Sequence, residues 1–340
     1  MHDYYFQTEV VRLSLVVGVV VSILFYERVQ LTTGGAIVPA YLAMFLPAPI
    51  FVVTTLVAGC LTYFCVSVVI AKRKILYGRR KFEVEMLVGL AFVALGTGGA
   101  LLLSGDRPQY VGLTGIGFLI PGVIAHDMFR QGPRKTLLAL GATTAIVGLF
   151  VFVFASLLAI SPVGGELPPL PDLPDVTGYP LALILPAVVT SVVAGMFVFS
   201  LLGLRSGGFI TGAYIALVLP RPLDIVFTLV VAAATWLVVS KLVMPRLLIF
   251  GRRKLSTMVI FGAILAWSAE ILLRAITTDG YIPWRGFTLV TVMIPALIAN
   301  DAQRQGFERT LWGAAITSLA VYGLMNVLAG VLRTAGVLAN

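Results

Sequence analysis

The sequence predicts an all-α, polytopic membrane helix bundle made of two parallel repeats, with short or broken helices and about 12 membrane segments. Three observations carry this prediction: an apolar composition, a duplicated chain, and uncharged runs long enough to cross a bilayer. Of the 340 residues, 59% are hydrophobic and 11% are charged, whereas an average soluble domain has about 25% charged residues. Too few polar side chains are present to cover a soluble globule, which excludes an ordinary soluble enzyme.

The chain contains two copies of one pattern. Residues 34–49 align with residues 207–222 at an offset of 173 (207 − 34), and residues 75–81 align with 248–254 at the same offset. Residues 120–132 align with 294–306 at an offset of 174. Three similar motifs in the same order indicate a tandem duplication. We expect membrane repeats over residues 1–160 and 179–340, joined by an acidic, proline-rich linker over residues 161–178 that lies outside the cell membrane.

Uncharged runs locate the membrane segments. Five runs are long enough to cross about 30 Å of hydrocarbon, namely residues 50–71, 86–104, 136–160, 181–204 and 310–332. Three further runs are shorter and use flanking basic side chains to reach the interface, namely residues 13–26, 225–240 and 255–269.

Four more segments, at residues 34–46, 109–125, 207–219 and 286–299, are short and interrupted by Gly or Pro at corresponding places of both copies. In transporters, such segments line a site or a pathway; Gly and Pro also serve simply to let helices pack closely. Both interpretations stay open for the residues that interrupt these segments, which are Gly34, Gly35, Pro39, Pro121, Gly207, Gly208, Gly212 and Pro295.

Basic residues set the expected orientation. The net charge is +9, and 15 of the 24 basic residues fall in the loops at 72–81, 126–135, 245–254 and 300–309. Basic loops face the cytoplasm, so the chain between the first two of these loops has to cross the membrane twice. The result is six crossings in each repeat, both termini outside, and parallel repeats in a multi-pass protein of the inner or cytoplasmic cell membrane.

Two recurring polar motifs lie in these cytoplasmic loops. The first is Gly-Arg-Arg-Lys, which serves either membrane topology and lipid contact or the attraction of a polyanion or an acidic partner surface. The second is Asp followed by Arg-Gln-Gly, either a capped helix end with a local Asp–Arg pair or a loop that contacts partner or substrate. The candidate partner- or polymer-binding residues are Arg79, Arg80, Lys81, Asp127, Arg130, Gln131, Arg252, Arg253, Lys254, Asp301, Arg304 and Gln305.

The sequence lacks the motifs of common catalytic chemistry. It contains no phosphate-binding GxxxxGK[ST] loop, no HExxH, no GxSxG and no Cys/His metal set. Asn300 stands opposite His126 in the second copy, which argues against an obligatory proton carrier or metal ligand there. We therefore expect no catalytic residue, no metal, no cofactor and no nucleic-acid partner. Glu270 and Arg274, four residues apart on one helix, are expected to pair with each other.

The first repeat resembles the integral-membrane CapC/PgsC family of poly-γ-glutamate capsule synthase subunits. The resemblance covers roughly residues 15–155 and rests on residues 75–82 (ILYGRRKF), 36–42 (AIVPAYL) after Glu27, and 115–125 (GIGFLIPGVIA) leading into 130–132 (RQG). The second copy is less similar, because Ser200 replaces Glu27 and Ala296 replaces Gly122. Since members of the family usually carry one copy, this chain resembles two fused subunits.

The resemblance implies a role in capsule biosynthesis beside a separate cytoplasmic, Mur-ligase-like enzyme that joins glutamate residues at the expense of ATP. This chain would then be non-catalytic by itself. It would anchor the ligase through its basic loops and help export the polyglutamate polymer, with membrane lipids as its remaining partners. Two alternatives stay open: a secondary transporter for an anionic solute, and a membrane enzyme acting on a lipid-linked substrate. The first predicts ionisable residues within the spans of both repeats, and the second predicts paired acidic residues there.

Overall fold

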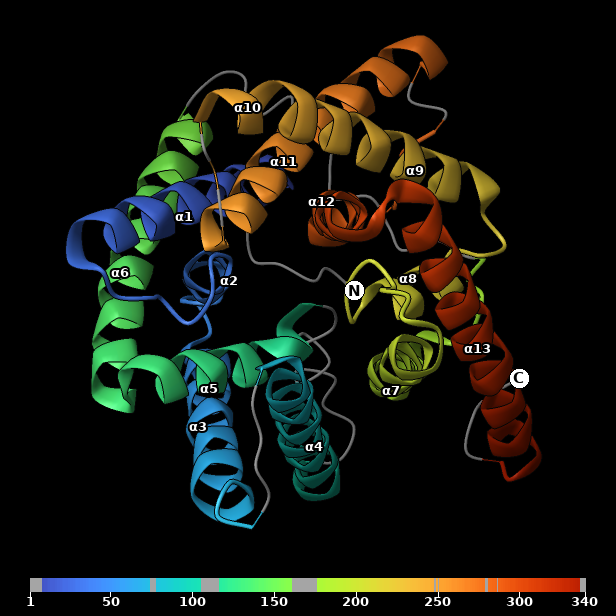
Figure 1. Ribbon diagram of the computed structural model, residues 1–340, viewed down its shortest axis with the longest axis horizontal. Helices are drawn as coiled ribbons and strands as arrows, with labels where there is room; N and C mark the ends of the chain where they lie inside the picture. Colours follow the sequence, from blue (N-terminus) through green and yellow to red (C-terminus); the bar gives the residue numbers. More distant parts are fainter. Residues whose placement is uncertain are drawn as a thin grey trace. The chain divides into compact units, whose positions relative to one another are not determined.

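The computed structural model describes residues 8–73, 78–104, 116–160, 176–247, 249, 251–278, 281–285 and 287–336. Regular structure in these residues is entirely helical, which confirms the predicted all-α fold. The chain divides into two compact units, Met1–Asp172 and Leu173–Asn340, shown in blue to green and in yellow-green to red in Figure 1. Most of the linker predicted over residues 161–178 lies outside the described residues, which resume at residue 176.

Unit 1 is built from four long and two short helices among its described residues. They are α1 (Thr8–Val29), α2 (Val38–Met44), α3 (Pro49–Phe64) with its π-helical extension η1 (Cys65–Ile70), α4 (Gly78–Ser104), η3 (Ile116–Leu119), α5 (Ile120–Gln131) and α6 (Pro133–Ile160). The short helix α2 packs on α1 and α6, whereas the short helix α5 packs on α3 and α4. Each short helix is therefore held between two long ones (Figure 1).

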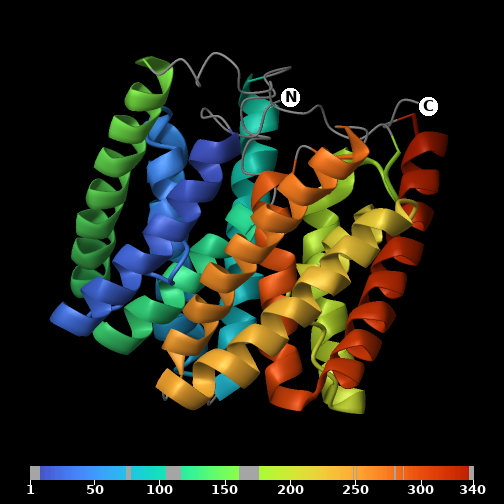
Figure 2. The ribbon, with the colours of Figure 1, turned by 90° about the horizontal axis from the view of Figure 1, so that it is seen from above.

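Unit 2 repeats this order of elements. They are η5 (Leu181–Leu183), α7 (Ile184–Leu202), α8 (Thr211–Leu217), α9 (Pro222–Leu237), η6 (Val238–Val243), α10 (Met244–Leu247), α11 (Arg252–Thr277), α12 (Thr288–Gln305) and α13 (Phe307–Thr334). Helix α8 packs on α7 and α13, and α12 packs on α9 and α11. Figure 2 shows the neighbours α9 and α11 side by side. The two copies thus share one packing scheme as well as one sequence pattern.

Among the described residues, eight helices are long and apolar enough to cross a membrane, and each uncharged run that the sequence singled out overlaps one of them. The runs at 13–26, 225–240 and 255–269 are parts of longer helical spans, Glu9–Val29, Pro222–Leu247 and Arg253–Thr277. Outward faces of these helices are rich in aliphatic side chains, for example Leu138 and Leu149 on α6, which are 74% and 69% exposed. Such surfaces suit lipid rather than water, so the protein is a multi-pass membrane protein.

Two of the four Gly/Pro-interrupted segments form helices much shorter than a full crossing needs. Helices α2 and α8 have 7 residues each and rise about 10 Å, a third of the hydrocarbon thickness. Eight residues without regular helix, 30–37, precede α2. Residues 109–115 and 286 of the other two segments lie outside the described residues. The crossings expected at α2 and α8 therefore have to include irregular chain, which survives at depth only when it is buried in protein.

Proline has different consequences in the two copies. Pro121 stands in the first turn of α5, directly after the 3-10 turn η3, whereas Pro295 lies inside the continuous helix α12. Proline is tolerated in a first turn, where its missing N–H has no helical partner, but it interrupts the hydrogen bonding of a helix interior. Both helices then end at a glycine with positive φ, Gly132 at 90° and Gly306 at 94°. This one residue separates α5 from α6 and α12 from α13.

Candidate functional site

The predicted polar motifs of each unit gather at one end, which we call its basic end. In unit 1 it is formed by the start of α4, the end of α5 and the chain between α1 and α2, and in unit 2 by the start of α11, the end of α12 and the chain between α7 and α8. Arg79, Arg80 and Lys81 occupy the first turn of α4, which contains no acidic residue. Positive charge at a helix N-terminus opposes the helix dipole, so helix stability does not explain this motif.

A glycine pair shapes the chain before each short helix. Gly34 and Gly35 have φ angles of 72° and 111°, and Gly207 and Gly208 repeat them at 75° and 109°. A Cβ atom on Gly35 would approach Val123 Cγ1 of α5 to 2.7 Å. Side chains other than glycine are strained at such φ angles and have no room here. The glycine pair therefore lets this chain segment press against α5, and its copy presses against Leu297 and Ile298 of α12.

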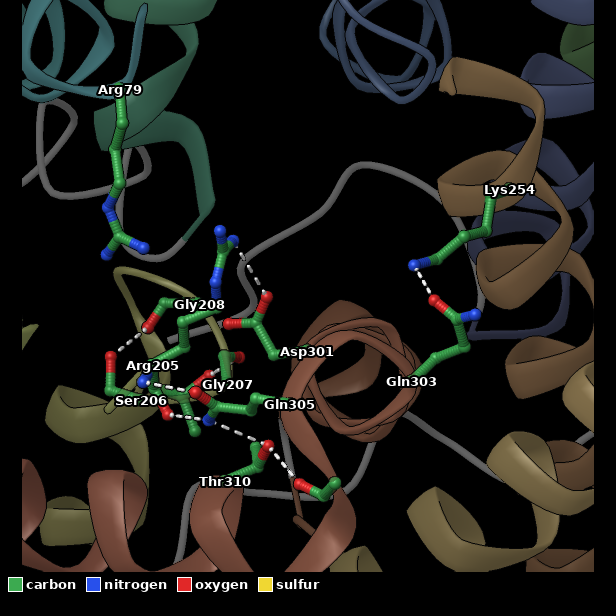
Figure 3. A network of polar contacts seen from close by, with 12 residues as sticks. Arg79, Arg205, Ser206, Gly207, Gly208, Lys254, Asp301, Gln303, Gln305 and Thr310 are labelled. Carbon is green, nitrogen blue, oxygen red and sulfur yellow. Dashed lines mark hydrogen bonds and ion pairs between the residues drawn. The ribbon is translucent and has the colours of Figure 1, made fainter. Parts of the chain in front are cut away.

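A glutamine at the end of α5 fastens the same segment in unit 1, and a glutamine at the end of α12 fastens its copy in unit 2. Gln131 Nε2 donates to the carbonyl of Thr32 at 2.6 Å, and the backbone N–H of Thr32 donates to Gln131 Oε1 at 2.8 Å. Gln305 makes the same two bonds with Arg205, both at 2.9 Å. Both glutamines also donate to the hydroxyl of a threonine five residues on, Thr136 or Thr310, at 3.0 Å. We call this arrangement the glutamine clamp (Figure 3).

The basic end of unit 1 contains its own neutralising carboxylates. Arg79 Nε donates to Glu83 Oε1 at 2.7 Å. Lys81, only 4% exposed, lies 3.6 Å from Glu85 Oε1 one turn along α4, and its ammonium also lies over the ring of Phe129. The other oxygen of Glu85 lies 2.7 Å from His126 Nδ1 on α5. Glu85 is fully buried, so it acts as the counter-ion of the buried Lys81 and as the side-chain partner of the half-buried His126.

The basic end of unit 2 uses different partners. Lys254, the counterpart of Lys81, is 7% exposed and donates to Gln303 Oε1 rather than to a carboxylate. Arg205 Nη1 lies 3.7 Å from Asp301 Oδ1. Figure 3 shows Gln303 with Lys254 on one side of α12, and Asp301 with Arg205 on the other. Asp301 thus forms an ion pair with the chain that precedes α8.

The remaining predicted site residues divide between solvent and the interior. Arg80, Arg130, Arg253 and Arg304 are exposed, whereas Asp127 is buried. The side chain of Arg252 lies outside the described residues. Of the residues that interrupt the short segments, Pro39 stands in the first turn of α2 and Gly212 in the first turn of α8, where a Cβ atom would approach Ser191 Oγ to 2.7 Å.

Glu85, His126 and Arg205 are among the residues of this region that were not predicted from the sequence. For Glu85 a signal existed, since it follows Lys81 by four residues and faces it on a helix. His126 was set aside because its counterpart is Asn300, yet the structure pairs it with Glu85 in unit 1 alone. Arg205 has Thr32 as its counterpart, and only the fold brings it beside Asp301.

A second polar cluster occurs at the opposite end of unit 2. Arg221 Nη2 lies 2.6 Å from Asp224 Oδ2, and the Tyr281 hydroxyl and the backbone N–H of Trp284 both donate to Asp224 Oδ1, at 2.5 and 3.2 Å. The Trp284 indole donates to Thr228 Oγ1 at 2.8 Å. Burial and the hydrogen bond to Asp224 raise the pKa of Tyr281 above its ordinary value. The cluster fastens the chain after α11 to the start of α9.

The pair expected between Glu270 and Arg274 is confirmed at 3.3 Å.

The fold and its two basic ends define a multi-pass α-helical membrane protein made of two homologous repeats. A comparison with protein families supplies the particular family: the family described as capsule biosynthesis CapC matches residues 17–137 and, separately, residues 190–311. The chain belongs to this family and carries its domain twice, which confirms the predicted internal repeat.

Two curated relatives agree with this assignment. The chain is 34% identical over 142 residues to the capsule biosynthesis protein CapC of Bacillus anthracis, and it covers 93% of that protein. It is 32% identical over 145 residues to the PGA biosynthesis protein CapC of Bacillus subtilis, and it covers 95% of that protein. The matches span 41% and 42% of this chain, as a fusion of two family domains requires. No solved structure matches the chain.

Proposed function

We propose that this protein is a membrane subunit of a poly-γ-glutamate capsule synthase. Its basic ends face the cytoplasm, hold a Mur-ligase-like ATP-dependent amide ligase and receive the growing anionic polymer, and its short helices contribute to the polymer's route across the membrane. The names of the two curated relatives support the role in capsule biosynthesis. The observation that carries the mechanistic part is the repeated basic helix start, placed in both units beside a glutamine clamp.

The electrostatics of the basic ends support a role in binding. Arginines in the first turn of α4 oppose the helix dipole, and exposed Arg80 and Arg253 project from equivalent positions of the two repeats. Such charges attract a polyanion, or an acidic surface of a partner, over several ångströms. Contact with anionic lipid headgroups is the competing explanation, worth about 1 kcal/mol per basic residue.

Buried carboxylates argue against a symmetric ion-coupled transporter. Glu85 in α4 and Asp224 in α9 are both fully buried, but their counterparts in the other repeat are the apolar Met258 and Phe51. A transporter in which both repeats carry the coupling ion would need ionisable side chains at equivalent depths. The described residues show none at these two places.

The test removes the exposed arginines and keeps the buried pairs. We expect the double variant Arg80→Ala/Arg253→Ala to lower polymer yield about tenfold or more, the effect of losing about 2 kcal/mol of electrostatic attraction, with normal amounts of protein in the membrane. Arg333→Ala, an exposed change near the end of α13, is the matched control and is expected to keep the yield. Equal yields from both variants would remove the basic ends from the mechanism.

A further inference from the structure

The two basic ends differ in the counter-ion given to the equivalent lysine. Lys81 has Glu85 one helical turn further along α4. The residue in the same place on α11 is Met258, four residues after Lys254 and fully buried. A pair of opposite charges four residues apart on one helix face neutralises itself. Unit 1 contains such a pair at this position, and unit 2 does not.

Lys254 consequently has a hydrogen-bond partner but no ion pair of its own among the described residues. In the described part of the chain its ammonium donates to the neutral amide oxygen of Gln303 and forms no ion pair with a carboxylate. Arg304 and Arg205 both lie near enough to repel its charge, while Asp301, already paired with Arg205, attracts it. A largely buried ammonium that is not charge-compensated is costly, and an incoming anion relieves that cost.

Two buried apolar residues recur in both units near these positions. In unit 1, Val66 and Ala125 are fully buried, and their counterparts in unit 2, Val239 and Ala299, are fully buried against Met258. In unit 1 a glutamate is accepted beside Lys81, which compensates its charge, and His126, which shares a hydrogen bond with it. Buried apolar neighbours alone therefore do not exclude an acidic side chain when basic groups lie beside it.

We propose that the basic end of unit 2, through Lys254 with Arg205 and Arg304, binds a carboxylate from outside the chain, at the place that Glu85 neutralises in unit 1. Resting on the function proposed above, the inference identifies this ligand as a free α-carboxylate of the γ-linked glutamate polymer, because the γ-carboxyl groups are used in its amide bonds. Gln303 holds the ammonium in place until the carboxylate arrives. Only one repeat then binds polymer at this position, while the other is closed by its own acid, and the duplicated halves have separate roles.

The experiment compares two substitutions of one side chain in the purified full-length protein. Binding of a fluorescently labelled γ-linked glutamate oligomer is followed by anisotropy at low and high salt. Wild-type protein is expected to bind one oligomer at this site, more weakly as salt increases. Met258→Glu supplies the internal carboxylate and is expected to weaken binding about tenfold or more, the size of one charge-assisted hydrogen bond. Met258→Gln introduces a side chain of the same shape as glutamate but without its charge, and it is expected to bind the oligomer as the wild type does.

Two further variants keep the test decisive if Met258→Glu folds poorly. Lys254→Met is expected to lose binding to a similar extent, whereas Glu85→Gln, which removes the counter-ion of Lys81, is expected to add a second site per chain. Equal binding by Met258→Glu and Met258→Gln would overturn the proposed site. So would the absence of salt-sensitive oligomer binding by the wild-type protein. Capsule yield is measured separately: loss of oligomer binding with an unchanged yield would leave the site in place and contradict the proposed function.

Discussion

At the scale of single residues, the glutamine clamp gives the Arg-Gln-Gly motif a structural meaning. Gln131 and Gln305 each satisfy both backbone groups of one residue more than 90 positions earlier in the chain, Thr32 or Arg205. The glutamine of the motif therefore joins the chain before α2 to the end of α5 in unit 1, and the chain before α8 to the end of α12 in unit 2. Arg130 and Arg304, the exposed neighbours of these glutamines, remain the members of the motif that are available to a partner.

Removing one clamp should destabilise its own unit. We expect Gln131→Ala to lower the free energy of unfolding by about 1–3 kcal/mol, because the N–H and C=O of Thr32 lose their partners. Gln131→Glu keeps the acceptor but sets a carboxylate oxygen against the carbonyl oxygen of Thr32, so its effect should be at least as large. Thermal unfolding in detergent measures both, and the double variant Gln131→Ala/Gln305→Ala should show the sum of the single effects, since the clamps lie in separate units. An unchanged midpoint for Gln131→Ala would contradict this role.

At the scale of elements, the short helices α2 and α8 depend on the glycine pairs that precede them. The paired positive φ angles recur within a few degrees in both copies, although the neighbouring residues differ: Thr33 donates its hydroxyl to Gly35 O, and Ser206 donates its own to Gly208 O, both at 3.2 Å. Few backbone conformations of an irregular segment inside a membrane leave its N–H and C=O groups hydrogen-bonded. The conformation found here has positive φ angles, which require glycine.

Adding one methyl group at Gly35 tests whether α2 depends on the glycine pair before it. Gly35→Ala is expected to cost about 1–3 kcal/mol from backbone strain alone, and its Cβ would also meet Val123 at 2.7 Å. We expect less folded protein in the membrane and a loss of polymer. Gly141→Ala on the exposed face of α6, where a Cβ atom meets nothing within 4 Å, should instead be neutral or slightly stabilising. If both variants accumulate and function equally, the glycine pair is not needed.

The sequence predicted the long helices more completely than it predicted the side-chain contacts at the basic ends. Apolar runs and the two offsets of 173 and 174 located every long helix, because length and composition alone decide membrane insertion. Helix lengths at the interrupted segments were not predictable, since the same proline begins α5 and lies inside α12. The pairs Glu85–His126 and Arg205–Asp301 join residues far apart in the chain. Their counterparts differ between the copies, so the repeat concealed them.

At the scale of the whole molecule, the account requires both basic ends to face the cytoplasm. In a background without Cys60 and Cys65, Arg80→Cys and Arg253→Cys place single thiols at exposed positions of the two repeats, and Val176→Cys places one before α7. A membrane-impermeant maleimide is expected to label position 176 in intact cells. Positions 80 and 253 should react only after the membrane is opened. Labelling of positions 80 and 253 from outside would invert the predicted topology.

The central proposal is that these ends hold a separate bond-forming enzyme. Its most direct test is photocrosslinking in living cells, with a photoreactive amino acid at position 80 or 253 and the captured protein identified by mass spectrometry. The account predicts capture of a cytoplasmic ATP-dependent amide ligase from both positions, and not from position 176. Capture of an extracytoplasmic protein, or of no ligase while capsule polymer is still being made, would contradict it.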